Sequence, residues 1–271
     1  MSSLESDVRD AGDGDRDGET SDAGSTAPVA GLLERIDTAA FGLIGHGICV
    51  TDTLLDEPGP RVLYVNQAYL DIFSCERDEV VGHSPRFAQG PLTDPATLAR
   101  IREHLVSARS IRAQAVNYRI DRTPFRLRWT IDPIRLGDEL AGFVAVMNDV
   151  TIDDRVRRRL SALDMLMTHG RAAVESPAAA RVGAIGRALA DSFEPLLEEV
   201  GEATVESFDA MVVTPTRCAA PERAILDSFV VADRLRVTLR IHPDGEPLVD
   251  RVAIDEMCHH ARWLLDLARW A

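Results

Sequence analysis

Four cysteines are the side chains of this chain best suited to act as nucleophiles or metal ligands. They are Cys49, Cys75, Cys218 and Cys258. No two of them have CxxC spacing and no export signal precedes them, so we expect free thiols rather than disulfides or a zinc site. The run Cys258-His259-His260 suggests a metal site only superficially, because adjacent residues of a helix point in different directions and nothing nearby completes a ligand set. We therefore expect no bound metal.

Phosphoryl transfer is a second chemistry for which the sequence can be searched. A histidine kinase is expected to carry a phosphoacceptor histidine followed by an acidic residue, together with a Gly-rich ATP-binding box. Here His169 is followed by Gly170, and no DxGxG stretch occurs. We therefore expect that the protein is not an enzyme. The opposing hypothesis, an enzyme with its active site in the C-terminal part, is kept as a third possibility beside the two given below.

The composition limits the kinds of partner. The 271 residues include 44 Asp and Glu against 30 basic residues, all of them Arg, for a net charge of −14, which resembles salt-adapted, halophile-like proteins. Such an acidic surface repels nucleic-acid backbones, so we expect no direct binding to DNA or RNA. No apolar run approaches the roughly 20 residues that cross a bilayer. We expect a cytoplasmic protein without a membrane partner.

The elements that would position these side chains fall into four parts. Residues 1–30 are acidic and rich in Gly, Ser and Thr, which predicts a disordered tail. Residues 31–151 start with a helical pattern and continue as two strands, short helices and three β-rich runs. A single helix is predicted for residues 152–172. Residues 173–271 predict a small α+β output domain of unknown type.

A long motif lies in residues 82–102. It reads GHSPRFAQGPLTDPATLARIR and is followed by Asn117-Tyr118 and by Asp149-Val150-Thr151. This pattern resembles the flavin-binding signature and the chain ending of light-oxygen-voltage (LOV) domains, which are a type of PAS domain. The resemblance covers roughly residues 41–151. It implies an α+β fold with a five-stranded antiparallel sheet and flanking helices.

The resemblance implies roles for four polar residues. Arg86 and Arg102 match the two arginines that hold the flavin phosphate in the family, a role that suits a forked and permanently charged guanidinium. Gln89 and Asn117 match amides that hydrogen-bond the ribityl chain and the ring. The loop after Gln89 has the short form found with FMN, so FMN is the implied cofactor.

Several positions depart from the family's pattern. The photoreactive cysteine falls on Pro85, which carries no nucleophile. The asparagine before it falls on Ser84, the second ring-binding asparagine falls on Leu127, and the glutamine that responds to the ring falls on Met147. We still count Leu127 and Met147 as pocket residues. A neutral hydrogen bond contributes only about 0.5 to 1.5 kcal/mol net, so the losses predict weaker binding rather than none.

Cys49 suggests a replacement for the missing thiol. Thr51 and Asp52 match the first strand of the family, and this alignment places Cys49 in the flavin pocket together with Thr51. One hypothesis is that Cys49 forms the photo-adduct in place of the usual cysteine. The alternative is that Cys49 is a small apolar core residue, as most buried free cysteines are.

The helix predicted for residues 152–172 carries a narrow apolar stripe at near-heptad spacing. The stripe consists of Ile152, Val156, Leu160, Leu163 and Met167. Such a stripe on an Arg-rich helix needs a partner, so we expect a homodimer through residues 152–169. The alternative is an ordinary linker helix.

Two functional hypotheses follow. The favoured one is a flavin-binding signal-transduction protein, either a blue-light photoreceptor or a flavin redox sensor, that acts through the helix of residues 152–169 on an unidentified downstream protein. The alternative is a PAS interaction scaffold without flavin. Absence of bound flavin after expression would favour the scaffold.

Overall fold

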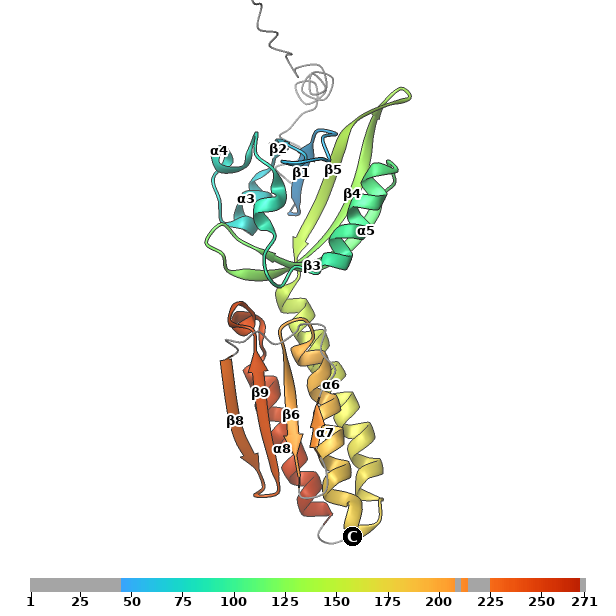
Figure 1. Cartoon of the computed structure of the whole chain (residues 1–271), viewed down its shortest axis with the longest axis vertical. Coiled ribbons are helices and arrows are strands. Elements are labelled where there is room, and N and C mark those ends of the chain that lie inside the picture. The colour runs from blue at the N-terminus through green and yellow to red at the C-terminus, as the bar shows by residue number, and fades with distance from the viewer. Residues whose placement is uncertain (1–44, 208–210, 214–224, 269–271) are drawn as a thin grey trace, which may run out of the picture.

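The computed structural model describes residues 45–207, 211–213 and 225–268, which form two α+β units connected by one long helix (Figure 1). The expectations of a disordered tail in residues 1–30 and of a helix beginning near residue 32 lie outside the described residues. No helix in the described ranges is both long and apolar enough to cross a bilayer.

The first unit contains a five-stranded antiparallel sheet with the order β2-β1-β5-β4-β3. The strands are β1 (Gly47–Thr51), β2 (Val62–Val65), β3 (Ile111–Tyr118), β4 (Pro124–Leu136) and β5 (Glu139–Asp149). Along the chain, two strands are followed by a helical segment and three further strands. This order confirms the five-stranded antiparallel sheet with flanking helices that the sequence predicts. Because every pair is antiparallel, short turns can join β3, β4 and β5 directly.

Short helices lie between β2 and β3. They are α3 (Gln67–Phe73), α4 (Arg77–Val80), the 3₁₀ helix η1 (Pro85–Ala88) and α5 (Pro95–Val106). The side chain of Asn66 caps α3 by accepting from the backbone N–H of Tyr69, and Asp94 caps α5 with a proline at the first helical position. These caps fix where each helix begins.

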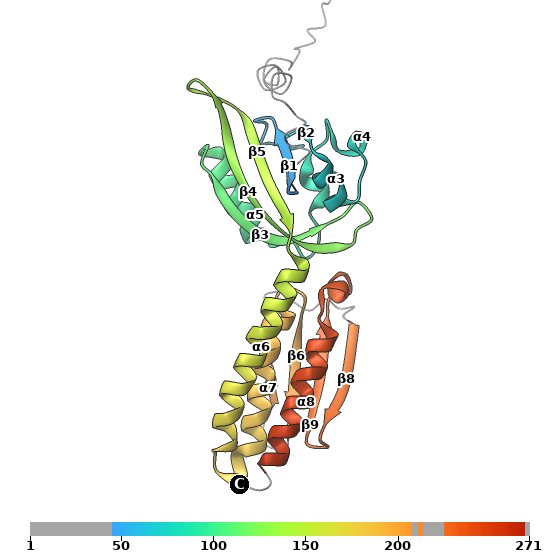
Figure 2. The same ribbon diagram turned by 180° about the vertical axis from the view of Figure 1, so that it is seen from behind.

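The second unit combines three helices with a four-stranded sheet of order β7-β6-β9-β8. Its elements are α6 (Thr151–Val174), η2 (Ala178–Ala180), α7 (Arg181–Leu197), β6 (Gly201–Glu206), β7 (Met211–Val213), β8 (Ile225–Val231), β9 (Leu235–Ile241), η3 (Pro243–Leu248) and α8 (Arg251–Leu267). The helix α6 leaves the first sheet directly after β5 and runs along the second unit (Figure 2). This arrangement confirms the predicted α+β class for both units.

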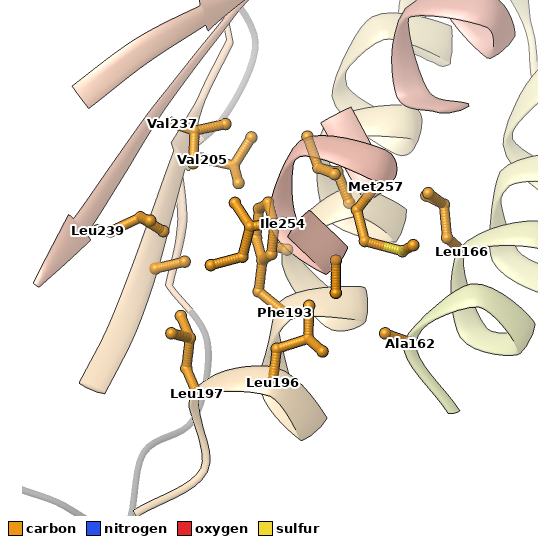
Figure 3. Packing of buried hydrophobic residues seen from close by; sticks show 14 of the residues in the cluster. Ala162, Leu166, Phe193, Leu196, Leu197, Val205, Val237, Leu239, Ile254 and Met257 are labelled. Carbon is orange, nitrogen blue, oxygen red and sulfur yellow. The ribbon is translucent and has the colours of Figure 1, made fainter. Parts of the chain in front are cut away.

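The core of the second unit lies between its sheet and its helices (Figure 3). Every second residue of β9 is buried, and its Val237 and Leu239 face Ile254 of α8 and Phe193 of α7. Leu166 and other buried residues of α6 belong to the same core. The helix that connects the two units is therefore packed into the second unit along most of its length.

Buried polar contacts join the two units where β4 meets α6. Asp154 Oδ2 of α6 forms an ion pair with Arg126 Nε of β4 at 3.1 Å and accepts a hydrogen bond from Arg158 Nε at 2.5 Å. Arg126 also pairs with Glu199, in the connection from α7 to β6. On the neighbouring strand β3, the hydroxyl of Tyr118 donates to Asp244 Oδ2 at 3.2 Å. We call the cluster of Arg126, Asp154, Arg158 and Glu199 the junction cluster.

Candidate ligand-binding site

A cavity of about 400 Å³ lies in the first unit between the sheet and its helices. Its lining includes every residue for which the sequence predicts a place in the site. These residues are Cys49, Thr51, Arg86, Gln89, Arg102, Asn117, Leu127 and Met147. The volume falls within the range of about 300 to 1,000 Å³ that is typical of small-molecule sites.

Strand alternation explains why sheet residues far apart in the sequence face this cavity. Side chains two residues apart share one face of a strand, which places Cys49 with Thr51 on β1 and Leu127 with Trp129 on β4. Met147 of β5 lies opposite Trp129 in the register. The sheet side of the cavity is therefore mainly apolar.

Two guanidinium groups meet at the mouth of the cavity. Arg86 Nη2 and Arg102 Nη1 both donate to the carbonyl oxygen of Leu55, at 3.0 and 2.5 Å. Arg86 also pairs with Glu57 at 2.5 Å, and Arg102 pairs with Asp56 at 2.8 Å. Both carboxylates are largely exposed. The arrangement is a positive pair that an anionic group can approach, and its present partners are exposed carboxylates.

The two amides come from different elements. Asn117 projects from β3 and is buried, and its Nδ2 makes one long contact of 3.4 Å with the carbonyl oxygen of Ala115. Gln89 ends η1, and its backbone oxygen accepts from Arg122. The side chains of Gln89 and Asn117 line the cavity together with Arg86 of η1 and Arg102 of α5. The site thus combines an apolar wall, amides and a cationic end.

Cys49 is a free thiol with only 3 % of its surface exposed. Burial raises its pKa to about 12, so the thiol stays protonated at neutral pH. Pro85, at the start of η1, lines the same cavity and supplies no thiol there. Of the other cysteines, Cys75 is buried outside the cavity lining, and Cys218 lies outside the described residues.

Sequence reasoning missed the aromatic residues of the cavity. Tyr69 and Phe73 of α3 and Trp129 of β4 all line it. Their spacing is that of ordinary apolar core residues, so the pattern alone could not separate a residue facing a cavity from one facing the core. For Tyr69, the one usable signal is its position three residues after the helix cap Asn66, which fixes it on the buried side of α3.

Comparisons with known proteins match the first unit to a domain family. Residues 46–151 match the PAS domain family. The chain is 39% identical over 87 residues to blue-light-activated histidine kinase 1 of Erythrobacter litoralis, which covers 32% of this chain and 24% of the relative. It is 32% identical over 117 residues to a blue-light-activated histidine kinase of Brucella anthropi, a match that covers 43% of this chain and 23% of the relative. A longer match of 222 residues to the Brucella ovis kinase is 26% identical and covers 76% and 42%.

The chain therefore spans less than half the length of these curated relatives. The relatives are named histidine kinases, which are enzymes. The expectation from the sequence that the protein is not an enzyme is wrong on this finding. It rested on His169 being followed by Gly170 and on the lack of a DxGxG stretch, and short motifs of this kind are a weak guide to a diverged chain.

Two solved structures are also similar. One is the LOV domain of the Erythrobacter litoralis EL346 blue-light-activated histidine kinase, with a TM-score of 0.37 at 26% identity, covering 39% of this chain and 96% of that one. The other is a light-oxygen-voltage domain studied with a flavin analogue, with a TM-score of 0.38 at 26% identity, covering 45% and 87%.

Proposed function

Residues 46–151 are a PAS domain homologous to those of blue-light-activated histidine kinases, and from this premise we propose that the cavity binds a flavin and that the protein is a flavin-based sensor. FMN is the flavin and blue light is the signal in this proposal. The observation that carries it is the single cavity in which an apolar wall, two amides and a pair of arginines come together.

The lining suits the three parts of FMN. The apolar wall around Leu127 and Trp129 suits a flat aromatic ring, and Gln89 and Asn117 offer hydrogen bonds to polar atoms of the ring and the ribityl chain. Arg86 and Arg102 suit the phosphate, because forked guanidinium groups bind phosphate oxygens through charge-assisted hydrogen bonds. The carboxylates that now pair with them are exposed and hold them weakly.

A bound flavin would supply the absorption of blue light and the reactive excited state. Cys49 is the cavity thiol available to bond to it, since Pro85 stands where the family's cysteine is expected. In such a reaction the S–H bond of Cys49 would break, the sulfur would bond to a carbon of the flavin ring, and the hydrogen would pass to the same ring. Without such a bond, the protein would act as a flavin redox sensor.

Alternation along the strands offers a route from the cavity to the second unit. On β4, Leu127 faces the cavity while its neighbour Arg126 belongs to the junction cluster. On β3, Asn117 faces the cavity while Tyr118 contacts Asp244 of the second unit. In this proposal, a change at the ligand shifts these strands and thereby alters how α6 packs.

The protein also acts as a homodimer in this proposal. Four apolar residues of α6 remain exposed, with 75% exposure at Ile152, 53% at Val156, 63% at Leu160 and 45% at Met167. Leu163, the fifth residue of the predicted stripe, is instead partly buried against the core of the second unit. An apolar stripe of this kind is stabilised by a second copy of the helix.

Binding of FMN tests the flavin proposal. The full-length protein, freed of ligand and then titrated with FMN, should quench FMN fluorescence in a saturable manner, and riboflavin should bind more weakly because it lacks the phosphate. Apparent dissociation constants in the micromolar range or below support the proposal. No saturable binding of either flavin would contradict it and favour the PAS interaction scaffold.

Phosphorylation of His169 is a second candidate function, favoured by the kinase relatives and by its position. His169 is about half exposed near the end of α6, and its Nδ1 lies 3.2 Å from Asp191 Oδ2 of α7. An exposed imidazole oriented by a carboxylate can act as a nucleophile toward phosphorus. This placement on a helical hairpin makes it the histidine to test.

Incubation of the protein with labelled ATP and Mg²⁺ tests this second candidate. The expected result is an acid-labile label in the wild type that is lost in His169→Gln and retained in His259→Gln, a change at an exposed histidine of α8. An unlabelled wild type, or equal labelling of both variants, would contradict it.

A further inference from the structure

Tyr69 is held in a fixed position beside the first strand. The Oδ1 atom of Asn66 accepts from the backbone N–H of Tyr69 at 3.0 Å and from the backbone N–H of Ile48 at 2.8 Å, which ties the start of α3 to β1. A Cβ atom at Gly47 would lie only 3.2 Å from the Cα of Tyr69, so the glycine allows this close approach. Packing and capping therefore set where the Tyr69 side chain points.

The hydroxyl of Tyr69 is buried and has no hydrogen-bond partner among the described residues. The side chain is 1% exposed, lines the cavity together with Cys49, and packs on the ring of Phe73 with 4.5 Å between centroids. A buried hydroxyl without a partner is costly, and a phenylalanine would fill the same space without that cost. The hydroxyl therefore needs a reason that packing does not supply.

The chain's other two tyrosines show how this differs from an ordinary structural tyrosine. The hydroxyl of Tyr118 donates to Asp244 and accepts from the backbone N–H of Leu92 at 3.1 Å. Tyr64 is half-buried on β2, outside the cavity lining, with the guanidinium of Arg77 over its ring. Tyr69 alone combines burial, a place in the cavity wall and a hydroxyl without a described partner.

We propose that the Tyr69 hydroxyl is a ligand-recognition group that donates a hydrogen bond to the molecule held in the cavity. This inference rests on the proposed flavin site and adds to it a donor outside the set for which the sequence predicts a role. It requires a ligand whose ring carries a polar acceptor on the side that faces α3 and β1, next to Cys49. Burial raises the pKa of Tyr69 well above its usual value, which keeps the donor proton in place.

Tyr69→Phe tests the proposal through two effects of opposite sign. In the full-length protein, FMN should bind about two- to tenfold more weakly, as expected for one neutral hydrogen bond. The ligand-free variant should unfold at the same or a higher denaturant concentration, because the unpartnered hydroxyl is gone. The absorption maximum of bound FMN should also shift between the wild type and the variant.

Two further variants serve as controls. Tyr64→Phe should leave the FMN dissociation constant unchanged, since Tyr64 lies outside the cavity lining. Tyr118→Phe should lower the stability of the ligand-free protein, because it removes the partner of Asp244 and of the Leu92 amide. Tyr69→Phe should behave unlike either of them.

The outcomes separate this inference from the proposed function. If the wild type binds FMN and Tyr69→Phe binds it equally well with the same spectrum, the Tyr69 inference is overturned and the flavin proposal stands. Destabilisation of the ligand-free Tyr69→Phe protein would also overturn it, since that is the mark of a structural tyrosine. If the wild type does not bind FMN, the flavin proposal fails, and the Tyr69 inference, which rests on it, fails with it.

Discussion

Replacing Asp154 by Asn should loosen the contact between the first and the second unit. The Asp154 side chain is fully buried. Its Oδ2 pairs with the Arg126 guanidinium and accepts from Arg158, and its Oδ1 accepts from Arg157 and from Gln114 Nε2. An asparagine keeps the shape but removes the negative charge. Two arginines with little exposure would then lose their shared counter-ion.

Two arguments give the free energy of unfolding that Asp154→Asn should lose. Removal of one partner from a buried ion pair costs about 3 to 5 kcal/mol, and the lower end applies here because Glu198 and Glu199 remain near Arg158 and Arg126. Burial opposes ionisation of Asp154, but hydrogen bonds and charges from the arginines outweigh it and lower its pKa from 3.8 to about 2. That difference corresponds to about 2 kcal/mol at neutral pH. We expect a loss of about 2 to 3 kcal/mol.

Urea denaturation followed by tryptophan fluorescence measures this loss, with Asp153→Asn as the matched control. Asp153 lies next to Asp154 in the first turn of α6 but is exposed, so its replacement should cost less than about 1 kcal/mol. Since the folded-state pKa of Asp154 is depressed, its contribution is complete above pH 4 and disappears as the pH falls toward 2. A loss below about 1 kcal/mol at pH 7, or a difference that persists undiminished at pH 2, would refute the reasoning.

Three further predictions concern the cavity and α6. Arg102→Ala should raise the dissociation constant of FMN about 10- to 100-fold in fluorescence titrations, because a charge-assisted hydrogen bond contributes about 1.5 to 3 kcal/mol, and it should leave that of riboflavin unchanged. An equal loss of affinity for both flavins would contradict a phosphate role for Arg102. Glu57→Gln should strengthen FMN binding by up to about fivefold, since it removes an exposed carboxylate that competes for Arg86; weaker binding would show that Glu57 instead supports the site. Leu160→Glu should convert the proposed dimer to a monomer in light-scattering chromatography, whereas Ser161→Glu, a change at an exposed neighbour, should not; an unchanged mass in Leu160→Glu would contradict a dimer formed through α6.

Much of the cavity could be predicted because the sequence resembles LOV domains over a long stretch. The motif of residues 82–102 places Arg86 and Arg102, and the match of the first and last strands to the family places Cys49 and Met147. The structure places all of these side chains around one cavity, while their roles toward a ligand stay predictions. Tyr69 escaped notice because a tyrosine at an apolar helical position looks like core, and its missing hydrogen-bond partner is visible only in three dimensions.

The junction between the units could not be predicted from the sequence for a different reason. Arg126 and Glu199 are 73 residues apart, and Tyr118 and Asp244 are 126 apart, so no local spacing connects them. On α6 the hydrophobic spacing picks out the apolar stripe that begins at Ile152, but the buried side of the helix starts with two charged residues, Asp154 and Arg158. Their polarity conceals the buried face from any search for hydrophobic periodicity.

The most direct measurement of the central claim is the absorption spectrum of the FMN-loaded protein before and after blue illumination, recorded for the wild type and for Cys49→Ala. The account predicts a flavin band that bleaches and recovers in the wild type and does not bleach in the same way in the variant, because Cys49 is the cavity thiol proposed to bond to the flavin. A wild type that does not respond to light would contradict the photoreceptor proposal. Identical responses in the two proteins would rule out Cys49 as the bonding thiol and leave a sensor that works by flavin reduction.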